Sequence, residues 1–485
     1  RRAFEKLVAM RMPFYEKFRF GDILTRFSTD VEGMMEMAGY GIVILLYAGG
    51  MIVFVIPTMF FISWEISLLA MIPLMTLMIW IYFLGKKQDK LVENNREAVA
   101  SLNDEVLETI EGVRVARAYS KKTTQKEQFQ LRTKALSKVG DQIARIQYLY
   151  APLSSVFIAL STIIVLLIGA IFIKMGQLTI GQVIALQLYM ISLIEPFWML
   201  SDFILVYQTG KTSFKKVTEL IETTDDMKMS GKEELKHLIS IRFQNYHFTY
   251  PQTKRPSLRN IAWQIEAGKT YGIVGKTGSG KTTLVRQLLQ QYPVGRGTFQ
   301  INGKSVSHYS RPSIEAMIGY VPQEHILFSK SVKDNIAFGK RNATLSDIEK
   351  AIKTAAFSED LKRMPDGLET LIGERGVSIS GGQKQRISLA RAFIRQPEVL
   401  ILDDSLSAVD AQTERRIIKN LQAMRANQTT IIVTHRLSAI QQADWVLVLE
   451  DGQIVEEGTP NQLLNKGGWY AEQYQRQQHQ KGGSK

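Results

Sequence analysis

The stretch "YGIVGKTGSGKTT", residues 271–283, decides the fold of the C-terminal half of the chain. An apolar strand runs into Gly275, a glycine-rich loop follows, and a helical pattern begins at Lys281. Glycines let backbone N–H groups turn inward around phosphate oxygens, and a helix N-terminus adds positive potential. By average amino-acid usage, the pattern G-x4-G-K-[ST] arises by chance in only about 2 chains in 100 of this length. The stretch therefore predicts a P-loop, a nucleotide-binding loop between a strand and a helix.

This loop and a second strand predict the nucleotide and metal contacts. Lys281 is expected to reach the β and γ phosphates, and the Thr282 hydroxyl is expected to ligate Mg²⁺. A buried strand, "EVLILDD", ends in Asp403, which beside a P-loop is expected to hold the Mg²⁺ shell. The predicted cofactors are ATP and Mg²⁺. The P-loop residues predicted to contact the nucleotide are Gly275, Thr277, Gly278, Ser279, Gly280, Lys281, Thr282 and Thr283.

A second glycine-containing motif, "SISGGQKQRISLARAF", opens a basic helix. Ser380, Gly381, Gly382 and Gln383 form another anion site at a helix N-terminus. A chain with its own P-loop has no second phosphate to place there. We therefore expect these residues to serve ATP that is bound to another subunit.

The N-terminal half is predicted to lie in a membrane, since its apolar runs are near or above the roughly 20 residues that a helix needs to cross a bilayer. These runs are residues 38–64, 66–85, 146–173 and 175–208. Residues 1–37 and 86–145 are rich in Lys and Arg, whereas the connections near Trp64 and Lys174 carry almost no basic charge. The positive-inside tendency therefore places the long segments in the cytoplasm, as helical extensions of a transmembrane domain over 1–210.

Composition predicts the other boundaries. Residues 211–239 turn polar and charged, which fits an exit helix followed by a linker. Residues 240–474 alternate short β-branched runs with longer helical patterns, as in a soluble α/β domain. Residues 475–485 are polar and are predicted to be a flexible tail. The fold class is an all-α transmembrane domain fused to an α/β P-loop domain.

Charge and cysteine content exclude several function classes. The formal net charge is +14, but the basic residues are spread without an aromatic-interleaved patch, so no nucleic-acid partner is expected. The chain has no cysteine, which excludes disulfides, thiol catalysis and Cys-ligated metals.

The motifs in this order resemble an ATP-binding-cassette (ABC) transporter over nearly the whole chain. They are the P-loop, "ISGGQ", "LILDD" and "IIVTH". The chain is similar to the exporter type, in which six membrane helices are fused to the cassette. The sequence predicts only the last four of those helices, so the first two are expected to precede Arg1. The resemblance implies a multi-pass protein of the cell membrane with its nucleotide-binding domain in the cytoplasm.

The resemblance also implies roles for residues outside the P-loop. Tyr250, in "FTYP", matches an aromatic residue that stacks on adenine, worth about 1–3 kcal/mol, although a strand tyrosine elsewhere is more often a packing residue. Gln323 matches a residue that meets Mg²⁺ and the attacking water. Asp410 matches the D-loop, and His435 matches the switch histidine near the γ-phosphate. The segment "EGVRVARAY", residues 111–119, resembles a coupling helix.

Asp404 departs from the pattern of family members that act as homodimers, which carry Glu after the metal-binding Asp. Asp404 is one methylene shorter, so its carboxylate falls about 1.5 Å short in a reaction where 1 Å of misplacement can cost on the order of 100-fold. The catalytic residues Asp404, His435 and Gln323 are therefore predicted to cleave ATP slowly. The signature at Ser380 is intact, so the chain resembles heterodimeric bacterial multidrug exporters, whose second half-transporter would carry the catalytic Glu. The alternative is a slow homodimer in which Asp404 does the work.

Two carboxylates interrupt the last apolar run. Glu195 and Asp202 are seven residues apart and share one helical face. Charged residues in a membrane helix normally face protein or a water-filled cavity. One interpretation is that Glu195 and Asp202 form a site for lipophilic cations. The other is that they line a water-filled vestibule or pair with another helix. Expected partners are the lipid bilayer and hydrophobic or amphipathic small molecules. A homodimeric lipid or peptide exporter and an ATP-gated channel or regulatory subunit remain alternatives.

Overall fold

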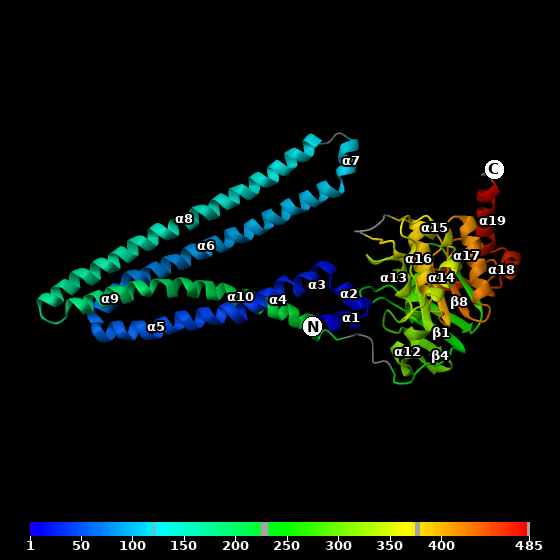
Figure 1. Ribbon diagram of the computed structural model, residues 1–485, viewed down its shortest axis with the longest axis horizontal. Helices are drawn as coiled ribbons and strands as arrows, with labels where there is room; N and C mark the ends of the chain where they lie inside the picture. Colours follow the sequence, from blue (N-terminus) through cyan, green and yellow to red (C-terminus); the bar gives the residue numbers. More distant parts are fainter. Residues whose placement is uncertain (120–121, 225–230, 374–378, 483–485) are drawn as a thin grey trace. The chain divides into compact units, whose positions relative to one another are not determined.

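The computed structural model of the chain describes residues 1–119, 122–224, 231–373 and 379–482 (Figure 1). The chain divides into two compact units. The helical unit is Ile23–Ile221, and the nucleotide unit combines Arg1–Asp22 with Glu222–Lys485.

Within its described residues the helical unit contains helices alone, and α6 and α8 run beside each other as a long antiparallel pair (Figure 1). Its elements are α3 (Phe20–Phe27), α4 (Thr29–Glu36), the π-helical segment η1 (Met37–Gly41), α5 (Ile42–Ile62), α6 (Trp64–Glu111), α7 (Val113–Ala118), α8 (Lys122–Lys174), α9 (Ile180–Ser192) and α10 (Ile194–Glu222). The short helix α7 lies within the segment that resembles a coupling helix.

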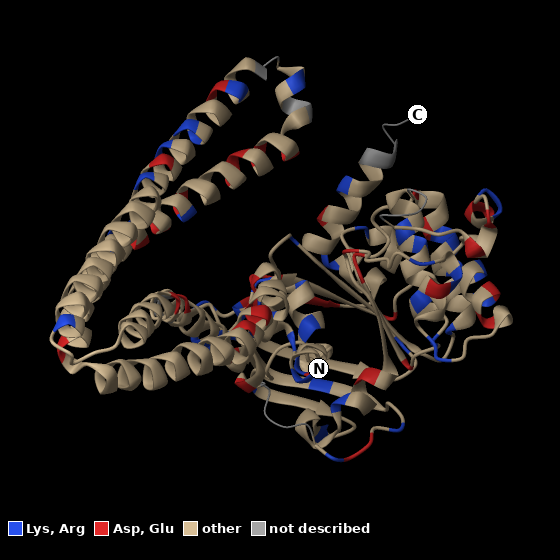
Figure 2. Ribbon diagram, turned by 60° about the vertical axis from the view of Figure 1, so that its left-hand side comes forward, with Lys and Arg blue, Asp and Glu red and all other residues tan. Residues whose placement is uncertain are grey.

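The two long helices change character along their length. Helix α6 has 48 residues and α8 has 53. At about 1.5 Å per residue they span roughly 70–80 Å, more than twice the roughly 30 Å of a bilayer core. Charged residues gather toward the α7 ends of both helices and are few toward the opposite ends (Figure 2). One part of each helix therefore suits hydrocarbon and the other suits water.

Three helical segments among the described residues are long and apolar enough to cross a membrane: Phe20–Ile62, Trp64–Glu111 and Thr123–Lys174. The predicted single span 175–208 is instead divided, since α9 ends at Ser192 and α10 begins at Ile194. Pro196 lies in the first turn of α10, where its missing N–H group costs no intrahelical hydrogen bond. The total of four crossings stays a prediction.

The core of the helical unit brings together side chains of α5, α6, α8 and α9. Met59, Ile66 and Leu186 are completely buried there. The hydroxyl of Ser161, on α8, donates to the Ala70 carbonyl of α6 at 2.9 Å. A hydrogen bond to a backbone carbonyl satisfies this hydroxyl in an apolar setting and ties the two long helices together.

Among the described residues of the nucleotide unit, strands form a four-stranded antiparallel sheet of order β2-β1-β4-β5 and a six-stranded sheet of order β10-β9-β3-β8-β7-β6. In the larger sheet, all neighbours pair in parallel except β10, which is an antiparallel edge. The strands are β1 (Ser240–Phe248), β2 (Leu258–Glu266), β3 (Thr270–Gly275), β4 (Arg296–Ile301), β5 (Lys304–Ser305), β6 (Ile318–Val321), β7 (Val399–Asp403), β8 (Thr429–Val433), β9 (Trp445–Glu450) and β10 (Gln453–Gly458).

The described helices of this unit begin with two short N-terminal ones and continue through the nucleotide domain. They are α1 (Arg2–Ala9), α2 (Met12–Lys17), α11 (Lys281–Leu288), η2 (Val306–His308), α12 (Arg311–Met317), α13 (Val332–Ala337), α14 (Leu345–Thr354), α15 (Ser358–Lys362), η3 (Gly367–Glu369), α16 (Gly381–Phe393), α17 (Ala411–Met424), η4 (Leu437–Ile440), α18 (Pro460–Lys466) and α19 (Trp469–Gly482).

The larger sheet is buried on both faces, which explains why its strands are nearly continuous apolar runs. On one face Val274 and Leu402 pack against α13, α14, α16 and α17. On the other face Ile273 and Ile401 pack against α11 and the smaller sheet. Because β3, β8 and β7 are parallel neighbours, their carboxyl ends meet at one edge, where ligands bind in open α/β sheets.

Both ends of the chain pack on the nucleotide domain. Arg11 donates to the Gln290 carbonyl at 2.9 Å and pairs with Glu315 at 2.6 Å, and the Tyr292 hydroxyl donates to Glu16 of α2. At the other end, residues 475–482, predicted to be a flexible tail, form the last turns of α19. This helix is anchored by Tyr470, which is completely buried, so the polar turns that follow extend from a fixed base.

Candidate functional site

The phosphate loop, residues 276–280, joins β3 to α11 at the carboxyl edge of the larger sheet. Gly275, Gly278 and Gly280 have φ of 147°, 83° and 100°, a region that side chains with a Cβ rarely adopt. A Cβ on Gly275 would lie 2.1 Å from the Leu449 carbonyl oxygen. Glycine is therefore required there by its backbone angle and by the close approach of β9.

Lys281 lies folded over this loop. Its Nζ donates to the carbonyls of Gly275 at 2.9 Å and Lys276 at 2.8 Å. Burial lowers the pKa of Lys281, an effect that Asp404 and Asp403 oppose. A buried ammonium group whose hydrogen bonds go to neutral carbonyls gains from a nearby anion, so Lys281 fits a phosphate contact.

One cavity of about 690 Å³ opens beside the loop. It brings together most of the predicted nucleotide, metal and catalytic residues. They are Thr277, Gly278, Ser279, Gly280, Lys281, Thr282, Thr283, Gln323, Asp403, Asp404 and His435. The Ser279 hydroxyl is buried and has no hydrogen-bond partner in the part of the chain that the structure describes. An unpaired buried hydroxyl at the cavity wall fits a site whose missing partner is a phosphate oxygen.

Asp403 and Thr282 offer a place for a divalent cation. The Thr282 hydroxyl points to Asp403 Oδ1 at 3.5 Å, and the Tyr320 hydroxyl donates to Oδ2 at 3.4 Å. Asp403 is 1% exposed, and burial raises its pKa. A buried carboxylate of raised pKa is stabilised by a hard cation, and carboxylate with hydroxyl oxygen suits Mg²⁺. The donor set fits the predicted metal.

Asp404 and His435 follow neighbouring strands. Asp404 has φ of 46°, and its N–H group donates to the Val433 carbonyl at 2.8 Å, so the chain turns sharply as soon as β7 ends. His435 follows β8 by two residues. Burial and the charge of Lys281 lower the pKa of His435, against the opposite effect of Asp404. The histidine is therefore neutral at neutral pH and can accept or donate a hydrogen bond.

Tyr250 does not line this cavity within the described residues. Its hydroxyl lies 3.0 Å from Thr283 Oγ1 and accepts from Arg286 at 3.4 Å, and its ring meets Tyr292 edge-on at 4.9 Å between centroids. It is thus tied to α11, the helix that follows the phosphate loop. Its stacking on adenine stays a prediction.

Several residues that line the cavity were not predicted from the sequence. They are Thr253, Arg255, Pro256, Ser257, Arg259, Val433, Thr434, Asp451 and Gly452. The basic pair at residues 254–255, soon after "FTYP", is the one signal that could have found part of this wall. Gly452 comes close because the β9–β10 turn approaches Ser257, whose carbonyl would lie 2.5 Å from a Cβ at this glycine.

The signature residues and Asp410 are absent from the lining of this cavity as far as the chain is described. Ser380 and Gln383 instead form a reciprocal cap at the start of α16. Asp410 caps α17 by accepting from Thr413 and Gln412, both at 2.9 Å, and these bonds lower its pKa to about 2. Both groups therefore cap helix N-termini that do not line the chain's own cavity, as far as the chain is described.

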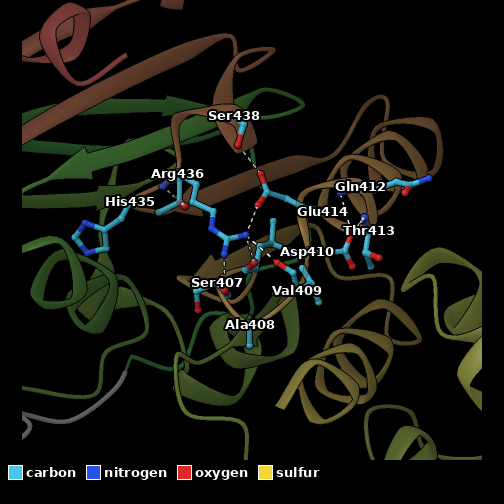
Figure 3. A network of polar contacts seen from close by, with 12 residues as sticks. Ser407, Ala408, Val409, Asp410, Gln412, Thr413, Glu414, His435, Arg436 and Ser438 are labelled. Atoms are coloured by element: carbon cyan, nitrogen blue, oxygen red, sulfur yellow. Dashed lines mark hydrogen bonds and ion pairs between the residues drawn. The ribbon is translucent and has the colours of Figure 1, made fainter. Parts of the chain in front are cut away.

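A polar network links the segment after β7 to the segment after β8 (Figure 3). The Arg436 guanidinium donates to the carbonyls of Leu406 at 3.3 Å, Ser407 at 2.6 Å and Val409 at 2.9 Å, and pairs with Glu414 at 2.8 Å. Glu414 is 1% exposed and also accepts from Ser438 at 2.7 Å. The sequence did not predict this network, because most partners of Arg436 are backbone carbonyls, and every residue type has a backbone carbonyl.

The two predicted substrate residues lie in the helical unit, on α10. The Tyr47 hydroxyl of α5 donates to Glu195 at 3.4 Å. Nearby in sequence, Trp198 meets Tyr150 of α8 edge-on at 5.9 Å. Asp202 is exposed. The Glu195 carboxylate thus has one aromatic partner, Tyr47 of α5, and Trp198, three residues further along α10, contacts a second aromatic residue on α8.

These features define a class of protein: a unit of membrane-length helices joined to a P-loop ATPase domain, in which the residues that open α16 do not line the chain's own cavity within the described residues. Family models agree with this reading, since "ABC transporter transmembrane region" matches residues 1–197 and "ABC transporter" matches residues 258–407. The chain belongs to the ABC transporter family, as a half-transporter of the exporter type.

Relatives of known name support this membership. The chain is 42% identical to the "Probable multidrug resistance ABC transporter ATP-binding/permease protein YheI" of Bacillus subtilis (strain 168), over 97% of this chain and 81% of that protein. It is 30% identical to an "ATP-dependent lipid A-core flippase" of Photobacterium profundum, over 97% of this chain and 80% of that protein. A solved "bacterial Atm1-family ABC exporter with ATP bound" shares the fold, with a TM-score of 0.82, 24% identity, and coverage of 98% of this chain and 84% of that one.

These comparisons confirm the predicted fold class, the assignment as a transport ATPase, and a multi-pass membrane location with the nucleotide-binding domain in the cytoplasm. Exporters of this family work as dimers in a membrane.

Proposed function

We propose that this chain is one half of a heterodimeric multidrug exporter, similar to the BmrC half of the Bacillus exporter BmrCD, and that it cleaves ATP slowly at its own P-loop. The observation that carries the proposal is Asp404, an aspartate at the position after the metal-binding Asp403. A relative of 42% identity with a multidrug name supports the class of cargo.

The proposed roles follow from positions around the cavity. Lys281 and the N–H groups of the phosphate loop bind and orient the β and γ phosphates, and Thr282, Asp403 and Gln323 hold the metal. Bound Mg²⁺ would neutralise charge that develops on the phosphates. Neutral His435 donates a hydrogen bond to the γ-phosphate. Asp404 orients the attacking water from a side chain that is about 1.5 Å too short, so that binding is retained and cleavage is slow.

The second ATP site is proposed to need this chain as well. Ser380, Gly381, Gly382 and Gln383 open α16 and do not line the chain's own cavity within the described residues, and the reciprocal cap between Ser380 and Gln383 holds the helix N-terminus in order. In a head-to-tail dimer they would complete the partner's site, where the partner supplies the catalytic Glu. One site would then cleave ATP while the other mainly holds it.

Glu195 and Asp202 are proposed as the substrate-contacting carboxylates, with lipophilic cations as the cargo. Glu195 has Tyr47 as a hydrogen-bond donor, and Trp198 and Tyr150 are on neighbouring turns and helices. A carboxylate with aromatic rings suits an amphipathic cation, which combines charge with apolar surface.

A homodimeric lipid exporter is the second candidate, because relatives of 30% identity carry a lipid flippase name. In that case Asp404 would have to act in both sites. The two candidates differ in what the chain does alone.

The test compares ATP turnover by the full-length chain alone, by the chain with the half-transporter encoded beside it, and by the chain with Asp404→Glu. We expect low turnover alone, high turnover for the pair, and a gain for Asp404→Glu; Asp404→Asn is the control that removes the carboxylate. Turnover by the chain alone at the rate of the pair would contradict the heterodimer and favour the second candidate.

A further inference from the structure

A single side chain of the C-terminal helix α19 makes two hydrogen bonds to the backbone of the loop that carries His435. Gln477 of α19 donates from Nε2 to the His435 carbonyl at 2.8 Å. Its Oε1 accepts from the Leu437 N–H group at 3.0 Å. One amide therefore fixes the backbone immediately before and immediately after Arg436.

The helix that carries Gln477 has a firm base. Tyr470 is completely buried in the core of the domain, and it lies seven residues before Gln477, on the same face of α19. The Trp469 N–H group donates to Glu456 at 2.5 Å, and Gln441, just after η4, donates to the Tyr474 hydroxyl at 3.4 Å. The Gln477 amide is thus presented from a rigid element.

Arg436 connects the backbone that Gln477 holds to the segment that follows β7. Its N–H group donates to the Thr434 hydroxyl at 2.9 Å, and its guanidinium holds three carbonyls within residues 406–409 together with buried Glu414 (Figure 3). A shift of the Arg436 backbone would move the guanidinium away from several acceptors at once. The position of the 406–410 segment therefore depends on the loop that Gln477 holds.

We propose that Gln477 is a positioning residue for ATP cleavage, which holds His435 at the cavity and, through Arg436, holds residues 406–410. The role goes beyond the proposed function, since it applies to a homodimer and to a heterodimer alike. Residues 475–482, which the sequence predicts to be a flexible tail, thereby contribute a residue that positions the His435 loop. The physical reason is that loops follow β7 and β8 here, and a loop backbone keeps its place only where its N–H and C=O groups have fixed partners.

Gln477→Met is the test variant, because methionine keeps the length and the helix propensity of glutamine but can neither donate to His435 nor accept from Leu437 with an amide. Gln475→Met is the matched control, since Gln475 is an exposed glutamine of the same helix. The full-length chain is reconstituted in lipid without another half-transporter, so that all measured cleavage depends on His435 of this chain. Single-turnover cleavage of radiolabelled ATP gives the maximum rate and the half-saturating ATP concentration even for a slow enzyme.

We expect Gln477→Met to lower the maximum rate about 5- to 10-fold, since sub-ångström misplacement of groups at a reacting centre is costly. The half-saturating ATP concentration should stay within about twofold, because the phosphate loop is untouched. Gln475→Met should leave both unchanged. A second variant, Gln477→Glu, places a carboxylate against the His435 carbonyl and should lose as much as Gln477→Met.

An unchanged maximum rate in Gln477→Met, or full activity in Gln477→Glu, would overturn the proposal. A fall in rate that comes with a lowered thermal midpoint and an equal fall in Gln475→Met would also overturn it, since that pattern marks a role in helix stability alone. Rates are compared within one preparation, so failure of this inference would leave the proposed function of the chain untouched.

Discussion

Asp404 shows how one backbone angle serves the site. With φ of 46° it lies in the left-handed region, which Asp and Asn enter more readily than most residues. The turn directs the chain out of β7 and leaves the Asp404 side chain at the cavity beside Asp403. Residues in sparsely populated conformations persist where the surroundings hold them, here by the bond from the Asp404 N–H group to Val433.

The ring of Tyr250 is expected to contribute to ATP binding by stacking on adenine. Tyr250→Ala should weaken ATP binding about 5- to 150-fold, since stacking of a base on an aromatic ring is worth about 1–3 kcal/mol. Tyr250→Phe keeps the ring and loses only the hydroxyl contacts with Thr283 and Arg286. It should therefore bind ATP within about threefold of the wild type. Equilibrium titration with a fluorescent ATP analogue measures both, and equal losses in the two variants would mean that the ring does not stack on adenine.

His435 predicts the pH dependence of cleavage. Burial and Lys281 lower the pKa of His435 from its ordinary value, so the folded protein keeps this ring neutral to a lower pH than a free histidine. Activity that needs the neutral ring should therefore be retained at about pH 6.5 and lost as the pH falls through the lowered pKa. Stability follows the same sign, because the unfolded chain takes up this proton first.

The measurement is the ATP cleavage rate against pH for the wild type and for His435→Gln. The variant should be slower at neutral pH and should lack the acid limb. An acid limb of the same midpoint in His435→Gln would assign it to another group.

Among the helices and strands, the sequence predicted those that a local pattern of residues specifies. It missed features that depend on contacts between segments distant in sequence. The P-loop and the strands ending at Asp403 and Val433 carry their own local signals, since glycine angles and apolar runs are properties of the segment. The break between α9 and α10 was missed, although Glu195 and Pro196 follow Leu193 closely, because a proline and an acidic residue in the first turn of α10 do not by themselves fix where the preceding helix ends. The last turns of α19 were missed because Gln477 finds its partners in a loop that is distant in sequence.

The packing of α8 against α9 depends on Gly169. A Cβ at Gly169 of α8 would lie 2.6 Å from Val183 of α9, so Gly169→Ala must displace the Val183 side chain or push these helices apart. Gly85 of α6 has open space around it, so Gly85→Ala is the matched control in a helix. We expect Gly169→Ala to destabilise the helical unit by about 1–3 kcal/mol. Gly85→Ala should be neutral or stabilising by up to about 1 kcal/mol.

Thermal unfolding of the full-length chain in detergent compares the two glycine variants. A lower midpoint for Gly169→Ala alone would support the close contact of α8 with α9. Equal midpoints for both variants would mean that Val183 moves aside at no cost, and that the tight approach is not a constraint on the unit.

At the scale of the whole molecule, the chain has to satisfy two solvents. In the helical unit, α6 and α8 each contain an apolar stretch long enough to cross a membrane, and charged residues gather toward the other end of each helix (Figure 2). In the nucleotide unit, parallel strands buried on both faces collect Lys281, Asp403, Asp404 and His435 at one edge. For α6 and α8 to fit both solvents, their charged ends must face the cytoplasm. This orientation can be tested directly.

The absence of cysteine makes the orientation measurable with single-cysteine variants. Ser137 is exposed on the charged part of α8, and Gln177 is exposed between α8 and α9. Because the long basic segments are expected in the cytoplasm, Gln177→Cys should react with a membrane-impermeant maleimide in intact cells, and Ser137→Cys should react only in inside-out vesicles. A membrane-permeant maleimide, which should label both variants in either preparation, controls for reactivity, and the unchanged chain gives the blank. Labelling of Ser137→Cys in intact cells would reverse the helices and place the nucleotide domain on the side without ATP, which contradicts a working transport ATPase.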